Sequence, residues 1–154
     1  MAKTVKPVPK EEPGKLKVKD FVITDEFDTI KAGASVRDTV RKLLDMKRGV
    51  VLVKSEDDNV LGVVTERKIL KGIMDQKEDP MAIDITKVMD TNIMYVREGD
   101  ELETALQDIK KNRPAAVIVN DQDGKFKGYF SPIDYIEAEG KLKNVRKAGE
   151  PASR

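Results

Sequence analysis

The sequence contains no cysteine, no histidine and no tryptophan, and aromatic residues make up only 5% of its 154 positions. Without cysteine and histidine there is no disulfide, no thiolate nucleophile, no imidazole base and no usual zinc-ligand set. No apolar run approaches the roughly 20 residues that span a bilayer, and residues 1–19 lack the apolar stretch of a secretory signal. These absences disfavour most catalytic and metal sites, and they predict a cytoplasmic protein without a membrane partner.

The charges almost cancel, because 29 Lys and Arg stand against 28 Asp and Glu. They are unevenly spread: residues 1–19 hold six Lys against two Glu, and residues 137–154 hold five Lys or Arg against three Glu. The body between these ends is therefore acidic. Two interpretations remain open: the basic ends are solvated termini, or they bind a nucleic acid electrostatically.

Both ends of the chain are poor in apolar residues. Prolines among lysines and glutamates predict a flexible N-terminal arm over residues 1–15. Near the other end, we expect a helix that frays past Gly140 into a basic tail over residues 140–154. Folded structure is expected between the arm and the tail.

An internal repeat appears when the chain is laid on itself with a constant shift of 66 residues and no gaps. Identical residues then coincide at glycine, valine and aspartate positions. The pairs are Gly33 with Gly99, Val51 with Val117, Val53 with Val119, Asp57 with Asp123, and Gly62 with Gly128. A unit of about 55 residues buries too little surface to be stable alone. The two copies are therefore expected to pack together.

Each copy shows the order strand, helix, strand, strand, helix, which predicts a mixed α/β (α+β) fold. Short strands are expected at residues 29–31 and 94–97, and the later strands of each copy are β-branched or aromatic runs joined by tight turns. We place the first unit at residues 16–74, a linker at 75–84 and the second unit at 85–139. The continuous apolar runs predict sheets covered on both faces, with the copies paired pseudo-twofold through them.

Two capping patterns mark the first helix of each copy. Ser35 with Asp38 forms an S-x-x-D signature before an apolar stripe of helical spacing. Asp100 with Glu103 is expected to repeat this device in the second copy.

The last strand of each copy ends in a short motif that opens a helix. It reads GVVTERK from Gly62 and GYFSPID from Gly128. A helix N-terminus attracts phosphate, and a hydroxyl from Thr65 or Ser131 adds a donor there. The carboxylate of Asp134 can accept hydrogen bonds from ribose hydroxyls. Because residues 131–134 also form a capping box with proline at the first helical position, ligand contact and capping both remain open at this point.

The doubled unit, its element order and the two motifs resemble the CBS-domain family, named after cystathionine β-synthase, whose signature reads G-h-h-[ST]-x-x-[DN]. The resemblance covers roughly residues 18–139. It implies a regulatory pair of CBS motifs that binds AMP, ADP, ATP or an S-adenosyl compound and that is not an enzyme. It also implies a homodimer paired through helices, which regulates a partner protein that the sequence does not identify.

The resemblance implies two clefts between the copies. Beside Ser131 and Asp134, with Tyr129 behind the motif, the matching positions at the start of the first copy are Ile23, Thr24, Asp28 and Val50. The opposite cleft would use Thr65, Arg67 and Lys68 with Met94 and Ala115. The apolar members of both sets also suit a plain core.

The first motif departs from the family pattern at Lys68, which stands where the ribose-binding acid is expected. An ammonium group cannot accept a hydrogen bond from a ribose hydroxyl. Lys68 and Arg67 could instead hold phosphate, the half-site could be empty, or Lys68 could be a solvated surface residue. The two clefts are therefore predicted to be unequal. The alternative function is a ligand-free interaction module or nucleic-acid-binding module that uses the basic ends.

Overall fold

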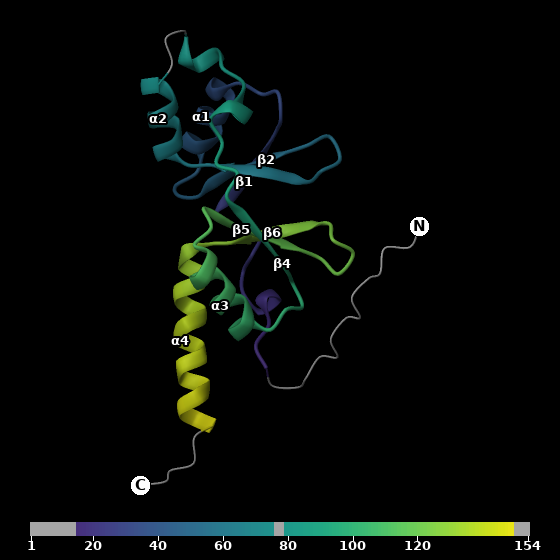
Figure 1. Cartoon of the computed structure of the whole chain (residues 1–154). Coiled ribbons are helices and arrows are strands. Elements are labelled where there is room, and N and C mark those ends of the chain that lie inside the picture. The colour runs from purple at the N-terminus through teal and green to yellow at the C-terminus, as the bar shows by residue number, and fades with distance from the viewer. Residues whose placement is uncertain (1–14, 76–78, 150–154) are drawn as a thin grey trace.

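The computed structural model describes residues 15–75 and 79–149, which form two units stacked sheet to sheet (Figure 1). In the first unit, β1 (Phe27–Lys31) pairs in parallel with β2 (Val50–Lys54), and β2 pairs antiparallel with β3 (Val60–Val64). In the second unit, β4 (Ile93–Arg97), β5 (Ala116–Asn120) and β6 (Phe126–Phe130) pair in the same way.

The two sheets share one register. Thr29 lies opposite Leu52 in the first sheet, and Tyr95 lies opposite Ile118 in the second, which are the same positions shifted by 66. Both sheets also carry an irregularity near the end of the middle strand, between Val53 and Lys54 and at the matching place in the second unit. The predicted repeat and its βαββα order are confirmed.

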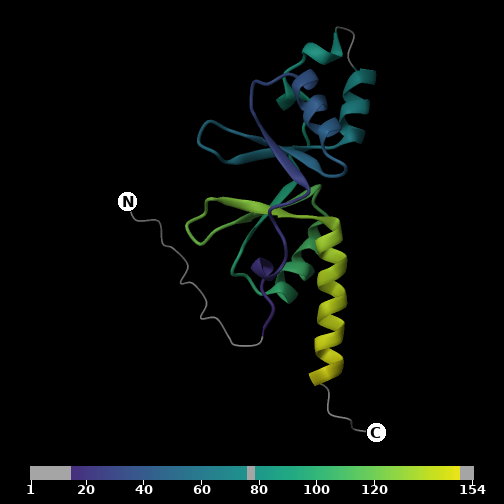
Figure 2. The same cartoon turned by 180° about the vertical axis from the view of Figure 1, so that it is seen from behind.

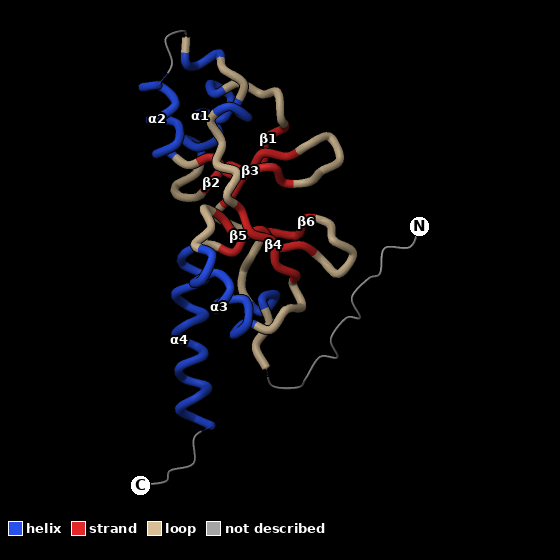
Figure 3. Tube along the Cα trace, viewed as in Figure 1, coloured by secondary structure: helices blue, strands red, loops and turns tan. Residues whose placement is uncertain are grey.

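Helices cover the outer face of each sheet, so that the layers run helix, sheet, sheet, helix (Figure 3). Among the described residues, the α-helices are α1 (Val36–Asp45), α2 (Glu66–Asp75), α3 (Leu102–Asn112) and α4 (Pro132–Gly149). Within the described ranges, no helix is apolar over a stretch long enough to cross a membrane.

The predicted cap of α1 is confirmed, but that of α3 is wrong. The Oγ atom of Ser35 accepts a hydrogen bond from the Asp38 N–H at 3.1 Å. The residue before α3 is Glu101, whose side chain makes no capping bond, whereas Asp100 accepts from the Arg97 N–H at 2.9 Å. Under the shift of 66 it is Glu101, one residue later, that matches Ser35. Asp100 therefore closes the turn after β4 instead of capping the helix.

The expected end of the last helix at Gly140 is also wrong, because α4 continues to Gly149. Glycine inside a helix costs about 1 kcal/mol relative to alanine. Beyond it, Leu142 packs against the core of the second unit, which favours continued helix. The described part of the expected tail is therefore helical, whereas residues 1–14 and 150–154, which hold most of the expected arm and the end of the tail, lie outside the described residues.

The segment before the first strand of each unit completes the core of the other unit. Val18, Phe21 and Ile23 are buried with Val96 and Leu102 of the second unit, although they lie in the first unit, ahead of β1. The contact is fixed by backbone hydrogen bonds, including Val18 N–H to the Asp100 carbonyl at 3.1 Å and Leu102 N–H to the Leu16 carbonyl at 2.9 Å. Figure 2 shows this purple segment lying along the lower unit.

The exchange is reciprocal. Ile85 and Val88 of the second unit, ahead of β4, are buried in the core of the first unit. Before them, the Ile83 carbonyl accepts from the Val36 N–H at 2.8 Å, at the start of α1. The later part of the expected linker, with Met81 and Ile83, thus packs against the core of the first unit together with the start of the second unit, and the two units are interlocked.

The inner faces of the sheets form a shared core. Six buried side chains meet there from both units: Leu52, Val60, Val63, Ala116, Ile118 and Tyr129. At its edge, the ring of Phe27 packs edge to face on Phe126 and Tyr129, with centroid distances of 5.5 and 6.4 Å. The predicted packing through the sheets is confirmed, and Tyr129 of the second motif belongs to this shared core.

Candidate ligand site at the start of the last helix

The second motif folds as a reciprocal capping box. The Ser131 N–H donates to Asp134 Oδ2 at 2.9 Å, and the Asp134 N–H donates to Ser131 Oγ at 3.1 Å. Both residues are buried, and α4 begins between them at Pro132. The capping interpretation therefore holds. It does not exclude ligand contact, because an ionised carboxylate has about four lone-pair positions and the cap uses one.

Glycine at the start of this motif permits a close contact between the units. The Tyr129 N–H donates to the Ile23 carbonyl at 2.7 Å, and a Cβ atom at Gly128 would overlap the same carbonyl oxygen. The segment before β1 is thus held directly against the motif. Of the four first-unit positions predicted for this cleft, Ile23 is the one that contacts it through the backbone.

Burial and neighbouring charges set the ionisation of this region. Burial raises the pKa of Asp134 above its ordinary value, against the hydrogen bonds from Ser131, and the charges of Glu26 and Asp25 add to the rise. Burial, with the charges of Glu26 and Asp134, raises the pKa of Tyr129 to about 12. An acidic segment of the first unit therefore faces the motif of the second.

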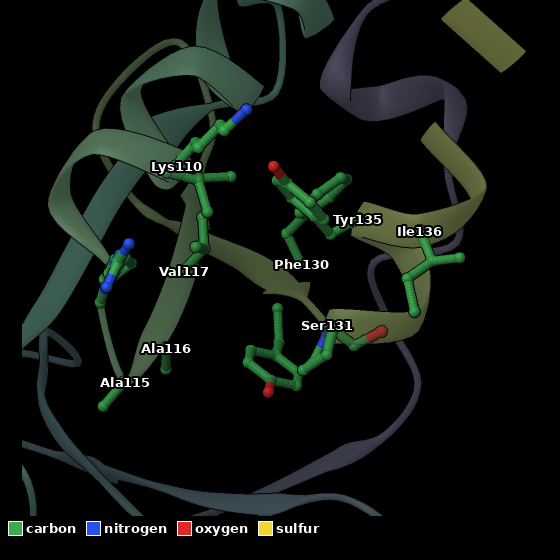
Figure 4. Close-up of a pocket in the computed structure, with 13 residues that line it drawn as sticks. Lys110, Ala115, Ala116, Val117, Phe130, Ser131, Tyr135 and Ile136 are labelled. Atoms are coloured by element: carbon green, nitrogen blue, oxygen red, sulfur yellow. The ribbon is translucent and has the colours of Figure 1, made fainter. Parts of the chain in front are cut away.

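A pocket of about 480 Å³ opens beside the motif (Figure 4). In that view, Lys110 of α3 and Tyr135 of α4 lie on facing sides of the pocket, with Ala115 and Ser131 at its lower end. The lining is mainly apolar with two cationic side chains. It consists of Ile109, Lys110, Arg113, Pro114, Ala115, Ala116, Val117, Tyr129, Phe130, Ser131, Pro132, Tyr135 and Ile136.

The pocket corrects one predicted assignment. Ala115 was expected in the opposite cleft with Thr65, but it lines this pocket together with Tyr129 and Ser131. The reason is the antiparallel register, which places Val117 opposite Phe130. Residues just before β5 must therefore flank residues just after β6, and the hairpin predicted from sequence already implied this.

Sequence reasoning missed the contribution of α3 to the site. Arg113 ends this helix in the left-handed region, with φ of 44°, and its N–H donates to the Ile109 carbonyl at 2.9 Å. It lines the pocket together with Lys110, one turn earlier on the helix. The signal available in the sequence was their position directly before β5.

The remaining residues predicted for this cleft do not all gather there. Val50 packs in the shared core that contains Tyr129, and Thr24 is exposed beside Ile23. The carboxylate of Asp28 points elsewhere, since Lys42 of α1 holds it at 3.4 Å.

The first motif is arranged differently. Thr65 Oγ1 accepts from the Lys68 N–H at 3.2 Å, and Lys68 Nζ lies 3.7 Å from Asp90 Oδ2. Arg67 is exposed. Met94, predicted for this cleft, packs against the core of the second unit. No group of three or more acidic side chains within the described ranges is placed to hold a metal ion.

Two βαββα units, interlocked and joined through their sheets, with a helix-opening motif at the end of each sheet, define a tandem repeat module. The sequence profile of the CBS domain matches residues 18–75 and 84–141. The chain therefore belongs to the CBS-domain family, whose tandem pairs are regulatory modules. No curated protein matches the chain in sequence.

Solved structures show the same fold. A CBS-domain-containing protein from Agrobacterium tumefaciens is 24% identical, with a TM-score of 0.65 over 80% of this chain and 98% of that one. A CBS domain pair/ACT domain protein from Thermotoga maritima is 21% identical, with a TM-score of 0.63 over 82% and 98%. The structure of CBSX2 in complex with AMP is 22% identical, with a TM-score of 0.64 over 82% and 98%.

Proposed function

We propose that this chain is a regulatory module without catalytic activity that binds an adenosine-containing ligand beside Ser131 and Asp134. AMP, ADP, ATP and S-adenosyl compounds are the ligands to consider. The observation that carries the proposal is the pocket of about 480 Å³ where β6 passes into α4, a volume typical of small-molecule sites. AMP in the similar structure of CBSX2 supports the class of ligand.

The lining of the pocket suits the parts of such a ligand. Tyr129 and Pro114 offer apolar surface for a purine. Asp134 does not line the pocket itself, but it is hydrogen-bonded to Ser131 and directly precedes Tyr135 in sequence, and both of these residues line it. Its carboxylate can accept hydrogen bonds from ribose hydroxyls beyond the one it takes from Ser131. Lys110 and Arg113 supply positive charge for a phosphate. A phosphorylated nucleoside would thus be held by α3, β6 and α4 together.

Regulation would follow from the contact between the second motif, beside the pocket, and the segment before β1. Ile23 is hydrogen-bonded to Tyr129 from the segment before β1, and Glu26 faces the motif. A ligand that contacts both the motif and this segment favours the arrangement in which they are close. It can shift that equilibrium only by its difference in affinity for the two arrangements.

Calorimetric titration with AMP, ADP, ATP and S-adenosylmethionine tests the proposal. We expect at least one of them to bind, and the Arg113→Ala variant to weaken AMP about tenfold, as loss of a charge-assisted hydrogen bond does. Lys111→Ala is the matched control, because this neighbouring cation lies on α3 but does not line the pocket. Adenosine should bind more weakly than AMP, with a difference that shrinks as salt rises.

Two results of these titrations would contradict the proposal. Absence of heat with all four compounds at millimolar concentration would remove the ligand-binding proposal. Equal losses in Arg113→Ala and Lys111→Ala would place the phosphate outside this pocket.

We also propose that the module forms a homodimer through its helices. Large apolar side chains are exposed on the outer layer, with Leu44 of α1 78% exposed and Met74 of α2 85% exposed. Leu70 of α2 and Ile136 of α4 are exposed as well, and α2 and α4 lie on the same side of the molecule in Figures 1 and 2. Apolar surface of this kind is typical of an interface between protein chains.

Light scattering after gel filtration tests the dimer. We expect the Met74→Glu/Ile136→Lys double variant to be monomeric. Val22→Glu, at an apolar residue outside these helices that is 63% exposed against 68% for Ile136, should stay dimeric. A wild-type chain that is monomeric at micromolar concentration would overturn this part of the proposal.

A further inference from the structure

The first motif is closed by an ion pair where the second has a carboxylate cap. Under the shift of 66, Lys68 occupies the position of Asp134. Its ammonium group reaches across to Asp90, in the segment that precedes β4, with Nζ 3.7 Å from Oδ2. The two side chains are 36% and 27% exposed, so the pair is partly shielded from water.

The carboxylate partner is held in place by the backbone. The Asp90 N–H donates to the Val63 carbonyl at 2.8 Å, and the Val63 N–H donates to the Asp90 carbonyl at 2.9 Å. The second side-chain oxygen, Oδ1, accepts from the Asn92 N–H at 2.9 Å. The carboxylate is thus fixed between the Asn92 N–H and the Lys68 ammonium.

The matching cleft at the second motif lacks this device. The position of Asp90 is taken there by Thr24, which is exposed and carries no charge. Close packing against the motif glycine is common to both clefts, because a Cβ atom at Gly62 would lie 2.8 Å from the Asp90 carbonyl oxygen and one at Gly128 would overlap the Ile23 carbonyl oxygen. The ion pair is therefore what distinguishes the first cleft from the second.

We infer that the Lys68–Asp90 ion pair replaces a ligand in the first cleft, so that each chain binds one adenosine ligand, at the second motif. The inference rests on the proposed function and specifies its stoichiometry. Lys68 has no acceptor for ribose hydroxyls, and the acceptor nearest to it is already engaged. The pair holds the first cleft closed, whereas the second cleft is left to respond to ligand.

The test gives the first cleft the two residues that stand at the matching positions of the second. In the Lys68→Asp/Asp90→Thr double variant, both positions carry the residues found at the second motif. Calorimetric titration of the full chain with AMP should give one ligand per chain for the wild type and two for this variant. The matched control is Lys71→Asp/Asp90→Thr, which makes the same charge change at an exposed lysine of α2 and should still bind one.

The Asp134→Ala variant locates the single site. Loss of all AMP binding in this variant supports the inference. Two ligands per wild-type chain, or one ligand retained by Asp134→Ala, would overturn it and leave the proposed function standing. One ligand in the Lys68→Asp/Asp90→Thr variant would also count against the proposed role of the Lys68–Asp90 ion pair, provided that its melting temperature shows the variant to be folded.

A ligand-free measurement separates the two proposals. If no adenosine compound binds, the proposed function fails and the ligand count fails with it. The Lys68–Asp90 ion pair itself is then tested by a double-mutant cycle of Lys68→Met and Asp90→Asn, in which melting temperatures are measured at low salt. Coupled shifts that fade at high salt support a closed first cleft, and additive shifts overturn it.

Discussion

Asp134 serves the fold and the proposed site with one side chain. Its carboxylate caps α4 through the Ser131 N–H, yet burial and the nearby acidic side chains raise its pKa. The ionised form is therefore less favourable in the folded protein than in the unfolded chain. A residue retained only as a cap has uncharged substitutes, such as Asn or Ser, that avoid this cost. Ribose binding would give the negative charge of Asp134 a role that capping alone does not require.

The Asp134→Asn variant separates capping from binding. The amide oxygen can still accept from Ser131, so we expect a melting temperature at pH 7 equal to or above that of the wild type. AMP affinity should fall about tenfold, because one charge-assisted acceptor is lost.

The pH dependence of this variant follows from the raised pKa. Because the pKa of Asp134 is higher in the folded protein than in the unfolded chain, the free energy of unfolding of the wild type falls as pH rises through the folded-state pKa. Any advantage of Asn should therefore grow with pH above the ordinary value of 3.8 and vanish below it. Denaturant melts at several pH values measure this difference. A variant that binds AMP as tightly as the wild type would leave Asp134 as a cap alone.

At the scale of the elements, the repeat made most of the sheet structure predictable. Strands appeared as β-branched or aromatic runs, and the shift of 66 related the strands of one copy to those of the other. Helix ends were less predictable, because they depend on tertiary contacts. Gly140 signalled an end to α4, but the packing of Leu142 prevails over a penalty of about 1 kcal/mol.

Two glycines on neighbouring elements test these conclusions in opposite directions. Gly128→Ala would place a methyl group on the Ile23 carbonyl oxygen, so we expect a loss of about 3 kcal/mol in the free energy of unfolding. Gly140→Ala meets nothing within 4 Å and should raise this free energy by about 1 kcal/mol. Urea denaturation measures both. No gain in Gly140→Ala would mean that the helix is frayed there, as the sequence had suggested.

For the whole molecule, the sequence predicted two copies packed together but not their interlocking. No pattern in the sequence marked Val18 and Phe21 as core, because apolar residues among charges are common on protein surfaces, and the neighbouring Val22 is 63% exposed. Nothing in a single sequence said that they would be buried in the second unit, because periodicity assigns a face to a residue but not a partner. The same limit hid Arg113 and Lys110, whose role depends on how α3 meets β6.

Interlocking predicts that the second unit cannot fold alone. A chain of residues 79–149 lacks Val18, Phe21 and Ile23, which are all buried against its core, each worth roughly 1.5–3 kcal/mol. A unit of this size has little stability in reserve, since domains of about 60 residues bury only about 60% of their surface. We expect this fragment to show no cooperative melt by circular dichroism, whereas the full chain should melt in a single transition.

Mixing two fragments of the chain tests whether the missing segment is the reason that residues 79–149 do not fold alone. Adding a fragment of residues 15–75 should restore a cooperative transition, because it supplies the segment that the second core lacks and receives in turn the one that precedes β4. The same fragment carrying Val18→Asp and Phe21→Asp is the control, and it should fail to rescue although its own sheet residues are unchanged. If residues 79–149 alone melt cooperatively near the temperature of the full chain, each unit is self-sufficient. A ligand at the junction would then act on two independent bodies and not on one interlocked core.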